Sequence, residues 1–319
     1  MGPRAGVFCH NGLGDGVNCL VLSNHLHLNG WRVDTYQNTI GSMQNWFPHL
    51  EVQSYPKMEN LPRILSAYDW YFVVHNDMDE FVKTLITEGK RRFPEKIKVL
   101  YFYPSRNIIN EPYYSDCLTD PKASIAENLR RLCEKILHLP KLTQSNGFIP
   151  PADLVYRKHP MRIVVHPTSA RVTRSWPKEN FVKLALHLEE KGFQLSFIPG
   201  GARERKEWED VLAYGFEVPV FSNLDLLARY IYESGYLIGN DSGPGHLASA
   251  MGIPTLTFCR RKALANMWAP SFHHGVVITP SSWIPNIRGF RLRDRHWKKF
   301  ITVGMARRAF ERLVHISSE

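Results

Sequence analysis

The sequence predicts an α/β protein of two domains, each built on a parallel sheet with helices on both faces. Short apolar segments alternate with segments whose apolar residues recur at helical spacing, which is typical of parallel sheets. This alternation stops at residues 145–151, a stretch of linker composition, and then starts again. The length of 319 residues also suits two domains of ordinary size.

The first domain is expected over residues 1–150, with strands at 5–9, 31–36, 70–74 and 98–102 and helices at 17–28, 80–92 and 123–137. The second domain is expected over 160–300, with strands at 162–166, 193–198, 218–221, 236–238 and 255–258 and helices at 178–191, 203–214, 224–233 and 246–251. The segment 301–319 is expected to form a helix near 303–314 that packs back on the first domain. We expect a cleft between the two domains, because ligands bind at the carboxyl ends of parallel strands.

The composition excludes several classes of protein. No apolar run reaches the ~18 residues that a membrane helix needs, and the N-terminus has no secretory-signal pattern. The five cysteines are widely spaced without a C-x-x-C pair, and the 14 histidines are scattered. We therefore expect no disulfide framework, no metal site and a reducing, cytoplasmic location.

The net charge of +10 lies mainly in the second half of the chain. Residues 1–160 carry 18 basic and 16 acidic residues, whereas residues 161–319 carry 22 and 14. A basic second domain suits an anionic ligand or an anionic membrane surface. A solvated basic face would give the same imbalance. The sequence contains no RNA-binding aromatic motif or zinc finger, so we expect no nucleic-acid partner.

A glycine loop, Gly12, Gly14 and Gly16 around Asp15, follows the first predicted strand. Three interpretations are open. Asp15 caps the helix that follows, or it serves as a general base for a substrate hydroxyl. Alternatively, the loop binds the dinucleotide of an NAD(P)-dependent oxidoreductase, with Asp34 at the end of the second strand on the ribose.

In the second domain, polar loops follow the predicted strands. Thr168 and Ser169 follow one strand, and Arg174 and Lys178 lead into the next helix; hydroxyl and cationic groups of this kind can hold a phosphate. Gly200 and Gly201 follow another strand and permit close approach of the backbone to a ligand, or form an ordinary turn.

The densest motif follows the strand at 236–238 and comprises Asp241, Ser242, Gly243, Pro244 and His246. The N-terminus of the helix that begins there, together with the Ser242 hydroxyl, would form a cradle for an anion. Asp241 is expected to fix the loop or to bind sugar hydroxyls. His246 is either a phosphate ligand or a structural histidine.

The order of these motifs resembles that of the ADP-heptose:lipopolysaccharide heptosyltransferases, glycosyltransferase family nine. The resemblance implies a GT-B fold, with two Rossmann-like domains facing each other across a cleft, and an inverting, metal-independent transfer that uses no cofactor. It implies a nucleotide-diphosphate sugar as donor, with an ADP-linked, heptose-like sugar, and a lipopolysaccharide-type glycan as acceptor. The family often has lysine where Arg174 stands and threonine where Ser242 stands.

The resemblance also implies roles for individual residues. Asp15 corresponds to the general base, on a loop that faces the acceptor. The residues implied in donor binding are Thr168, Ser169, Arg174, Lys178, Gly200, Gly201, Asp241, Ser242, Gly243, Pro244 and His246. A non-catalytic nucleotide-sugar binder and a sugar-nucleotide epimerase remain open alternatives.

A basic stretch between Arg288 and Lys299 carries Phe290 and Trp297 among its cations. Such a stretch suits peripheral contact with an anionic membrane, at the inner face of the cytoplasmic membrane, where a lipid-linked acceptor would lie. A solvated loop is the alternative interpretation.

Overall fold

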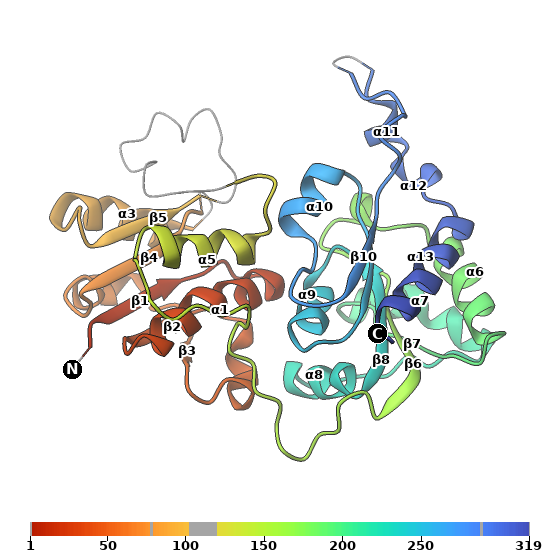
Figure 1. Ribbon diagram of the computed structural model, residues 1–319, viewed down its shortest axis with the longest axis horizontal. Helices are drawn as coiled ribbons and strands as arrows, with labels where there is room; N and C mark the ends of the chain where they lie inside the picture. The colour runs from red at the N-terminus through yellow and green to blue at the C-terminus, as the bar shows by residue number, and fades with distance from the viewer. Residues whose placement is uncertain (1, 77–78, 102–119, 288–289, 319) are drawn as a thin grey trace. The chain divides into compact units, whose positions relative to one another are not determined.

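The computed structural model describes residues 2–76, 79–101, 120–287 and 290–318. The chain divides into two compact units, Met1–Pro151 and Ala152–Glu319, and each contains one five-stranded parallel sheet (Figure 1). The predicted architecture of two parallel-sheet α/β domains is therefore confirmed.

The first sheet has the strand order β3-β2-β1-β4-β5. Its strands are β1 (Arg4–Phe8), β2 (Arg32–Tyr36), β3 (Glu51–Gln53), β4 (Trp70–Val74) and β5 (Ile97–Leu100), and the α-helices described are α1 (Leu13–Leu28), α2 (Leu61–Ile64), α3 (Glu80–Arg92) and α5 (Ile125–Lys135). An aromatic-rich core joins α3 to one face of the sheet, where Phe8 stacks on Tyr36. The central strand β1 ends at the glycine loop, so that loop lies at the carboxyl edge of the sheet.

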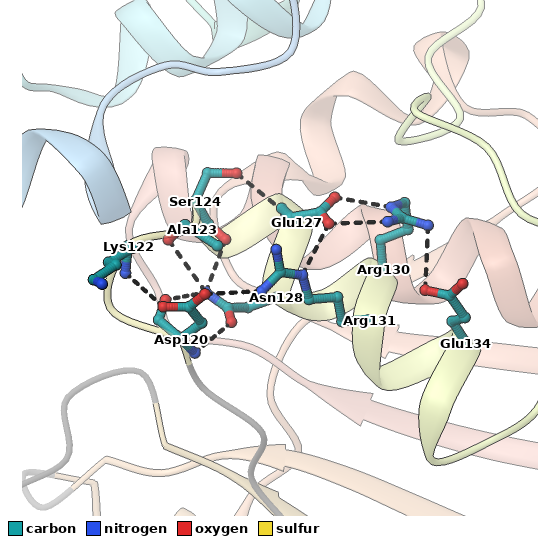
Figure 2. Close-up of polar contacts among 9 residues, drawn as sticks. All are labelled: Asp120, Lys122, Ala123, Ser124, Glu127, Asn128, Arg130, Arg131 and Glu134. Carbon is teal, nitrogen blue, oxygen red and sulfur yellow. Dashed lines mark hydrogen bonds and ion pairs between the residues drawn. The ribbon is translucent and has the colours of Figure 1, made fainter.

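A polar network fixes the start of α5 (Figure 2). The Ser124 hydroxyl accepts the Glu127 N–H group, and the Glu127 carboxylate binds the guanidinium groups of both Arg130 and Arg131. The buried Asn128 amide donates to the carbonyl oxygen of Asp120 at 3.0 Å. The Ser124 bond satisfies an N–H group that the first turn of a helix leaves unpaired, and the other bonds join the helix to its own next turn and to the segment before it.

The second sheet has the strand order β10-β9-β8-β6-β7. Its strands are β6 (His159–His166), β7 (Gln194–Phe197), β8 (Ser234–Asn240), β9 (Thr255–Phe258) and β10 (Gly275–Ile278). Its helices are α6 (Lys178–Glu189), α7 (Ala202–Trp208), α8 (Leu224–Tyr232), α9 (Gly243–Ala250), α10 (Lys262–Trp268), α11 (Leu292–Arg295), α12 (Trp297–Phe300) and α13 (Val303–Ile316). Strand β10 was not predicted; its residues are only alternately buried, as expected of an edge strand.

The strand predicted at 218–221 does not form. The chain makes only a single bridge there, between Ser196 and Glu217. Pro219 has no backbone N–H group and cannot continue the ladder of hydrogen bonds.

The last helix, which was expected to pack back on the first domain, belongs to the second unit. Helix α13 lies in the second unit and contributes Ala306, Phe310 and Leu313 to its core. The helix contacts α6, β9 and β10. Its apolar residues recur at positions i, i+4 and i+7, a pattern that predicts a buried face but not the sheet that covers it.

The basic stretch also differs from expectation. Trp297 is 2% exposed and belongs to the core, so it is not available for a membrane, whereas Phe290 is 53% exposed. Arg288 and Gly289 lie outside the described residues. Among the helices that the structure describes, none is long and apolar enough to cross a bilayer.

We predict that Phe310→Ala loosens the second unit alone. Its ring lies 5.2 Å from those of Phe193 and Tyr236, and removing it costs about 3–5 kcal/mol of unfolding free energy. Hydrogen exchange followed by mass spectrometry should accelerate in β9 and β10 and stay unchanged in β1 and β2. Arg312→Ala, an exposed position on the same helix, is the control. Equal acceleration in the first unit would contradict the assignment of α13.

Candidate active site

A buried amide shapes the glycine loop of the first unit. The Gln37 side chain donates from Nε2 to the carbonyl oxygens of His10 at 3.0 Å and Gly12 at 3.1 Å. Its Oε1 atom accepts the N–H groups of Thr39 and Ile40. Gln37 is 1% exposed, so these bonds form away from solvent. The loop is thus held by the turn after β2, and sequence reasoning missed this residue.

Asp15 lies in the first turn of α1, where its carboxylate meets the positive end of the helix. The cap residue itself is Gly12, which offers no side chain to the helix. A methyl group on Gly12 would stand 2.3 Å from Asp15 Oδ2, so the absence of a side chain at residue 12 makes room for this carboxylate. Gly14 and Asp15 are half-buried.

Gly16 is buried where α1 meets the turn after β2. A methyl group there would lie 2.9 Å from Gln37 Cδ and 3.1 Å from Ile40 Cγ2. The glycines at 12 and 16 thus serve local packing around Asp15.

The dinucleotide interpretation of this loop is wrong. Asp34 lies in the middle of β2, opposite Gly6, and not at the end of the strand. Its carboxylate accepts hydrogen bonds from Arg4 Nη2 at 3.1 Å and from the Tyr68 hydroxyl at 2.6 Å. Because these groups occupy the carboxylate, it does not stand where a ribose-binding acid is needed.

In the second unit, the sheet order brings three predicted loops together. Strand β6 lies between β7 and β8, so the segments that follow these strands meet at one edge. Thr168 Oγ1 accepts the Gly200 N–H group at 3.1 Å, which joins the loop after β6 to the loop after β7. At the end of β6, His166 Nδ1 lies 2.6 Å from the carbonyl oxygen of Ile198. Burial lowers the pKa of His166 to about 4, so the ring is neutral at pH 7 and Nδ1–H donates this bond.

Asn240, which is 1% exposed, joins the loop after β8 to the loop after β6. Its Oδ1 atom accepts the Trp176 N–H group at 2.8 Å, and its Nδ2 atom donates to the carbonyl oxygen of Pro167 at 2.6 Å. Trp176 in turn stacks on Phe258 at 4.2 Å and donates from Nε1 to the carbonyl oxygen of Ile301. Sequence reasoning did not identify Asn240 as the residue that positions these loops.

Ser242 occupies the cap position of α9 but does not cap it with its side chain. Its hydroxyl donates to the carbonyl oxygen of Asn240 at 3.1 Å. Gly243 and Pro244 begin the helix, and the His246 ring is buried, with Nε2 3.8 Å from Asp241 Oδ1. The Nδ1 atom of His246 has no hydrogen-bond partner among the described residues. The start of α9 therefore carries the positive end of a helix with no acidic side chain in its first turn.

Arg174 carries a positive charge at this edge, in the turn between β6 and α6. Its guanidinium is exposed and has no hydrogen-bond or ion-pair partner within the part of the chain that the structure describes. Burial raises the pKa of the Cys259 thiol to about 11, and the charge of Arg174 opposes that rise, which places this cation near the end of β9. Ser169 donates to the carbonyl oxygen of Arg171 at 2.8 Å and so shapes the turn that carries Arg174.

Lys178 does not join this group, contrary to expectation. Its ammonium group binds Asp210 Oδ1 and the carbonyl oxygen of Glu207, each at 2.5 Å. Lys178 begins α6, and its side chain extends to the end of α7 and to the residues directly after that helix. The sequence predicts that this lysine lies in the first turn of a helix, but it does not predict the direction in which the side chain extends.

The two glycines after β7 differ in their surroundings. A methyl group on Gly200 would lie 1.8 Å from Glu204 Oε2, so the Glu204 side chain would have to move. Gly201 precedes α7 and has no atom within 4 Å of such a methyl group. Gly201 therefore leaves open space at this edge.

The described residues contain no group of three His, Cys, Asp or Glu side chains placed to hold a metal ion. The described cysteines Cys9, Cys19, Cys133 and Cys259 are buried and free. Burial, followed by the proximity of Cys19 and of Asp15, raises the pKa of the Cys9 thiol, so it stays protonated at neutral pH.

Comparison with known proteins finds similarity to one glycosyltransferase family over part of the chain. Residues 124–263 match the model of glycosyltransferase family 9 (heptosyltransferase). Over 101 residues the chain is 27% identical to lipopolysaccharide heptosyltransferase 3 of Escherichia coli and 32% identical to lipopolysaccharide heptosyltransferase 1 of Pseudomonas aeruginosa. These alignments cover 30% and 31% of this chain and 29% and 28% of the two relatives. The chain thus aligns with less than a third of either relative's length.

Solved structures extend the likeness to the whole fold. E. coli heptosyltransferase WaaC with ADP superposes with a TM-score of 0.68 at 16% identity, covering 97% of this chain and 99% of that one. The iron-containing dodecameric glycosyltransferase TibC of enterotoxigenic E. coli gives 0.59 at 12% identity, covering 99% and 80%. The two α/β domains have the GT-B fold of the heptosyltransferases. The family match contains the loops from Thr168 to His246 but not the glycine loop around Asp15.

We predict that Asn240→Ala destabilises the protein and disorders the donor loops. The change leaves the Trp176 N–H group and the Pro167 carbonyl group buried without partners, at about 1–3 kcal/mol for each. Asn240→Asp keeps the acceptor for Trp176 but turns a carboxylate oxygen toward the carbonyl oxygen of Pro167 in a buried site, so it should also be less stable than wild type. Urea denaturation measures the unfolding free energy of each protein. An alanine variant as stable as wild type would contradict this role.

We also predict that His166 makes stability fall in mild acid. Its pKa is near 6.5 when unfolded and about 4 when folded, so the unfolded state takes up the proton first. This group contributes almost no pH dependence above about pH 7.5 and removes about 2 kcal/mol of unfolding free energy between pH 7.5 and 5. His166→Asn retains an amide donor for the carbonyl oxygen of Ile198 but has no group that titrates in this range. Between pH 7 and 5, the unfolding free energy of this variant should therefore fall by about 2 kcal/mol less than that of wild type. Parallel pH profiles of the two proteins would refute the prediction.

Proposed function

We propose that this chain, which is similar to glycosyltransferase family 9 (heptosyltransferase), transfers a sugar from a nucleotide-diphosphate donor to a hydroxyl group of a glycan. The observation that carries the proposal is the clustering of loops in the second unit. Thr168, Gly200 and Ser242 come from three neighbouring strands and lie at one sheet edge, with Arg174, which has no side-chain partner among the described residues, beside them. The matched family segment spans these loops.

The second unit would bind the donor diphosphate. When the bond between the sugar and the diphosphate breaks, negative charge gathers on the leaving phosphate oxygens. The positive end of α9 and the Arg174 guanidinium offer fixed positive charge where this negative charge develops. Groups that are already in place stabilise a transition state without having to reorganise. Hydroxyl groups of Thr168, Ser169 and Ser242 can donate to phosphate or sugar oxygens once a ligand displaces their present partners. We infer an ADP-linked, heptose-like donor from the family.

Asp15 would act as the general base. The acceptor hydroxyl oxygen attacks the anomeric carbon, the bond from that carbon to the diphosphate oxygen breaks with its electron pair, and Asp15 takes the hydroxyl proton. Attack from the face opposite the leaving group inverts the anomeric configuration. The geometry around Gly12 supports this role, since a side chain there would displace the carboxylate.

We further propose that the transfer needs no metal ion. The cation of Arg174 and the helix end of α9 would take the role that a divalent ion has on a diphosphate. TibC, which has a similar fold, is by contrast an iron-containing glycosyltransferase. Addition of a chelator to the assay tests it: activity should persist.

Both curated relatives are lipopolysaccharide heptosyltransferases, which favours a lipopolysaccharide-type acceptor. We propose a cytoplasmic enzyme that works at the inner face of the membrane, where such an acceptor would be displayed. The exposed side chains of Trp283, Ile287 and Phe290, on the segment that carries α11, would supply apolar contact. Flotation with phosphatidylglycerol vesicles measures this contact, and loss of flotation in Trp283→Ser would support it.

We predict that Asp15→Asn lowers kcat by about 10²–10⁴-fold and leaves ADP affinity within about twofold of wild type. The amide keeps the shape of the carboxylate but cannot take the proton. Turnover of ADP-heptose in the presence of a lipopolysaccharide core acceptor, and calorimetry with ADP, give the two values. A variant with wild-type turnover would exclude Asp15 as the base. Conversion of the donor to its epimer by the wild type without any acceptor would favour an epimerase.

Gly12→Ala supplies a second variant for the same question. The added methyl group displaces the Asp15 carboxylate, so turnover should fall while ADP binding persists. Gly41→Ala, where a methyl group meets no atom within 4 Å, is the matched control and should retain wild-type turnover.

A further inference from the structure

A basic pocket lies in the second unit, with a volume of ≈ 710 Å³. The polar side chains that line it include those of Thr173, Arg260, Arg261, Arg291, Arg295 and Lys298. Arg260 and Arg261 follow β9, and the others come from the turn before α6 and from the segment of α11 and α12. Thr173 belongs to the same turn after β6 as Thr168 and Arg174, so the pocket borders the proposed donor-binding loops, whereas its other lining residues come from segments outside the loops of Thr168, Gly200 and Ser242.

The charges of the pocket are poorly compensated. Asp294, the acidic residue in its lining, binds Arg261 at 2.5 Å. Burial alone would raise the pKa of Asp294, but the bonds to Arg261 and Asn286 lower it, so the carboxylate is ionised. That leaves four cationic side chains in the lining, Arg260, Arg291, Arg295 and Lys298, with no acidic partner among the described residues. An anion bound here would relieve their mutual repulsion.

Arg260 bears the strongest signs of this repulsion. Burial, followed by the nearby charge of Arg261, lowers the pKa of its guanidinium, and the charges of Arg174 and Arg291 add to the effect. The Nε atoms of Arg260 and Arg261 are buried and have no hydrogen-bond partner in the described structure. Buried donors without partners are costly in a folded protein and are satisfied when a ligand supplies oxygen atoms.

The wall of the pocket is fixed in advance. Trp297 is buried, and its Nε1 atom donates to the carbonyl oxygen of Thr173 at 3.2 Å. Lys298 Nζ donates to the carbonyl oxygen of Val172 at 3.0 Å and retains two further N–H groups. These bonds hold α12 against the turn that carries Arg174. Thr173 lines this pocket, and the next residue, Arg174, is proposed to bind the donor diphosphate. A ligand in the pocket would therefore lie beside that diphosphate.

We propose that this pocket binds a phosphomonoester group on the sugar acceptor. Guanidinium groups bind phosphate oxygens through pairs of parallel hydrogen bonds, and several of them together favour a dianion over a single carboxylate. The volume exceeds that of one phosphate, which leaves room for the sugar that carries it. Naming the ligand as the acceptor rests on the proposed function, whereas phosphate binding itself does not.

Calorimetry with glucose 6-phosphate tests the pocket, with glucose and ADP as companion ligands. The pocket variant is Arg291→Gln with Arg295→Gln, two exposed residues whose loss should not unfold the chain. The control variant is Arg308→Gln with Arg312→Gln, which makes the same change in charge at two exposed positions of α13 with the same spacing. Thermal unfolding verifies that both variants remain folded.

Wild type should bind glucose 6-phosphate and not glucose. The pocket variant should lose at least about tenfold in affinity for glucose 6-phosphate, with ADP affinity within about twofold, and the control variant should match wild type. Equal affinity of the pocket variant and wild type for glucose 6-phosphate would overturn the proposal, as would an absence of binding to wild type. A parallel loss of ADP affinity would also overturn it, because the pocket would then belong to the donor.

Flotation with vesicles distinguishes binding of a soluble sugar phosphate from binding of a lipid headgroup. If the pocket variant loses flotation with phosphatidylglycerol vesicles but keeps its affinity for glucose 6-phosphate, the cations serve a membrane and the proposal fails. Failure of the proposed transfer reaction would appear elsewhere, as absent ADP binding or an Asp15→Asn variant with full turnover. The two failures are thus distinguishable.

Discussion

The second unit depends on one buried side chain, the amide of Asn240. A parallel sheet brings its loops to one edge but does not fix their conformation. Asn240 does so by bonding the backbone of Pro167 and of Trp176 at once, and through them it holds the whole turn between β6 and α6. Because Trp176 also bonds Ile301, the same contact reaches the segment before α13. Hydroxyl groups and Arg174 are thereby presented from a fixed backbone, which is what binding of an anion in a developing transition state requires.

The first unit uses the same device at its own sheet edge. Gln37 bonds four backbone groups of two segments and is as fully buried as Asn240. A neutral amide suits this task, because it offers both a donor and an acceptor and carries no charge that burial would penalise. The charged groups Asp15 and Arg174 lie on the segments that these amides hold, half-buried and exposed respectively. Fixed neutral groups thus orient the ionised ones.

The sequence predicted the parts that follow from local patterns. The alternation of strands and helices indicated the two sheets, and polar residues directly after strands indicated the loops of Thr168, Gly200 and Ser242. It failed where side-chain direction decides the outcome. Lys178 turns toward Asp210, Asp34 lies within its strand, and α13 packs on the sheet of its own unit. Gln37 and Asn240 carry no periodic or charge signal, so their role appears only when the residues they bind are brought near them by the fold.

Part of the positive charge in the second half of the chain lies around the basic pocket. The cations between Arg288 and Lys299 form one stretch in the sequence, but the described residues of this stretch have different surroundings in the fold. Trp297 is an anchor in the core, and Arg291, Arg295 and Lys298 join Arg260 and Arg261 around a hollow. Arg260 and Arg261 come from a distant part of the chain, the end of β9. A solvated basic face would spread these charges outward to lower their repulsion. Their convergence on a hollow, with two buried Nε atoms left unbonded among the residues that the structure describes, is instead the arrangement that an anionic ligand stabilises.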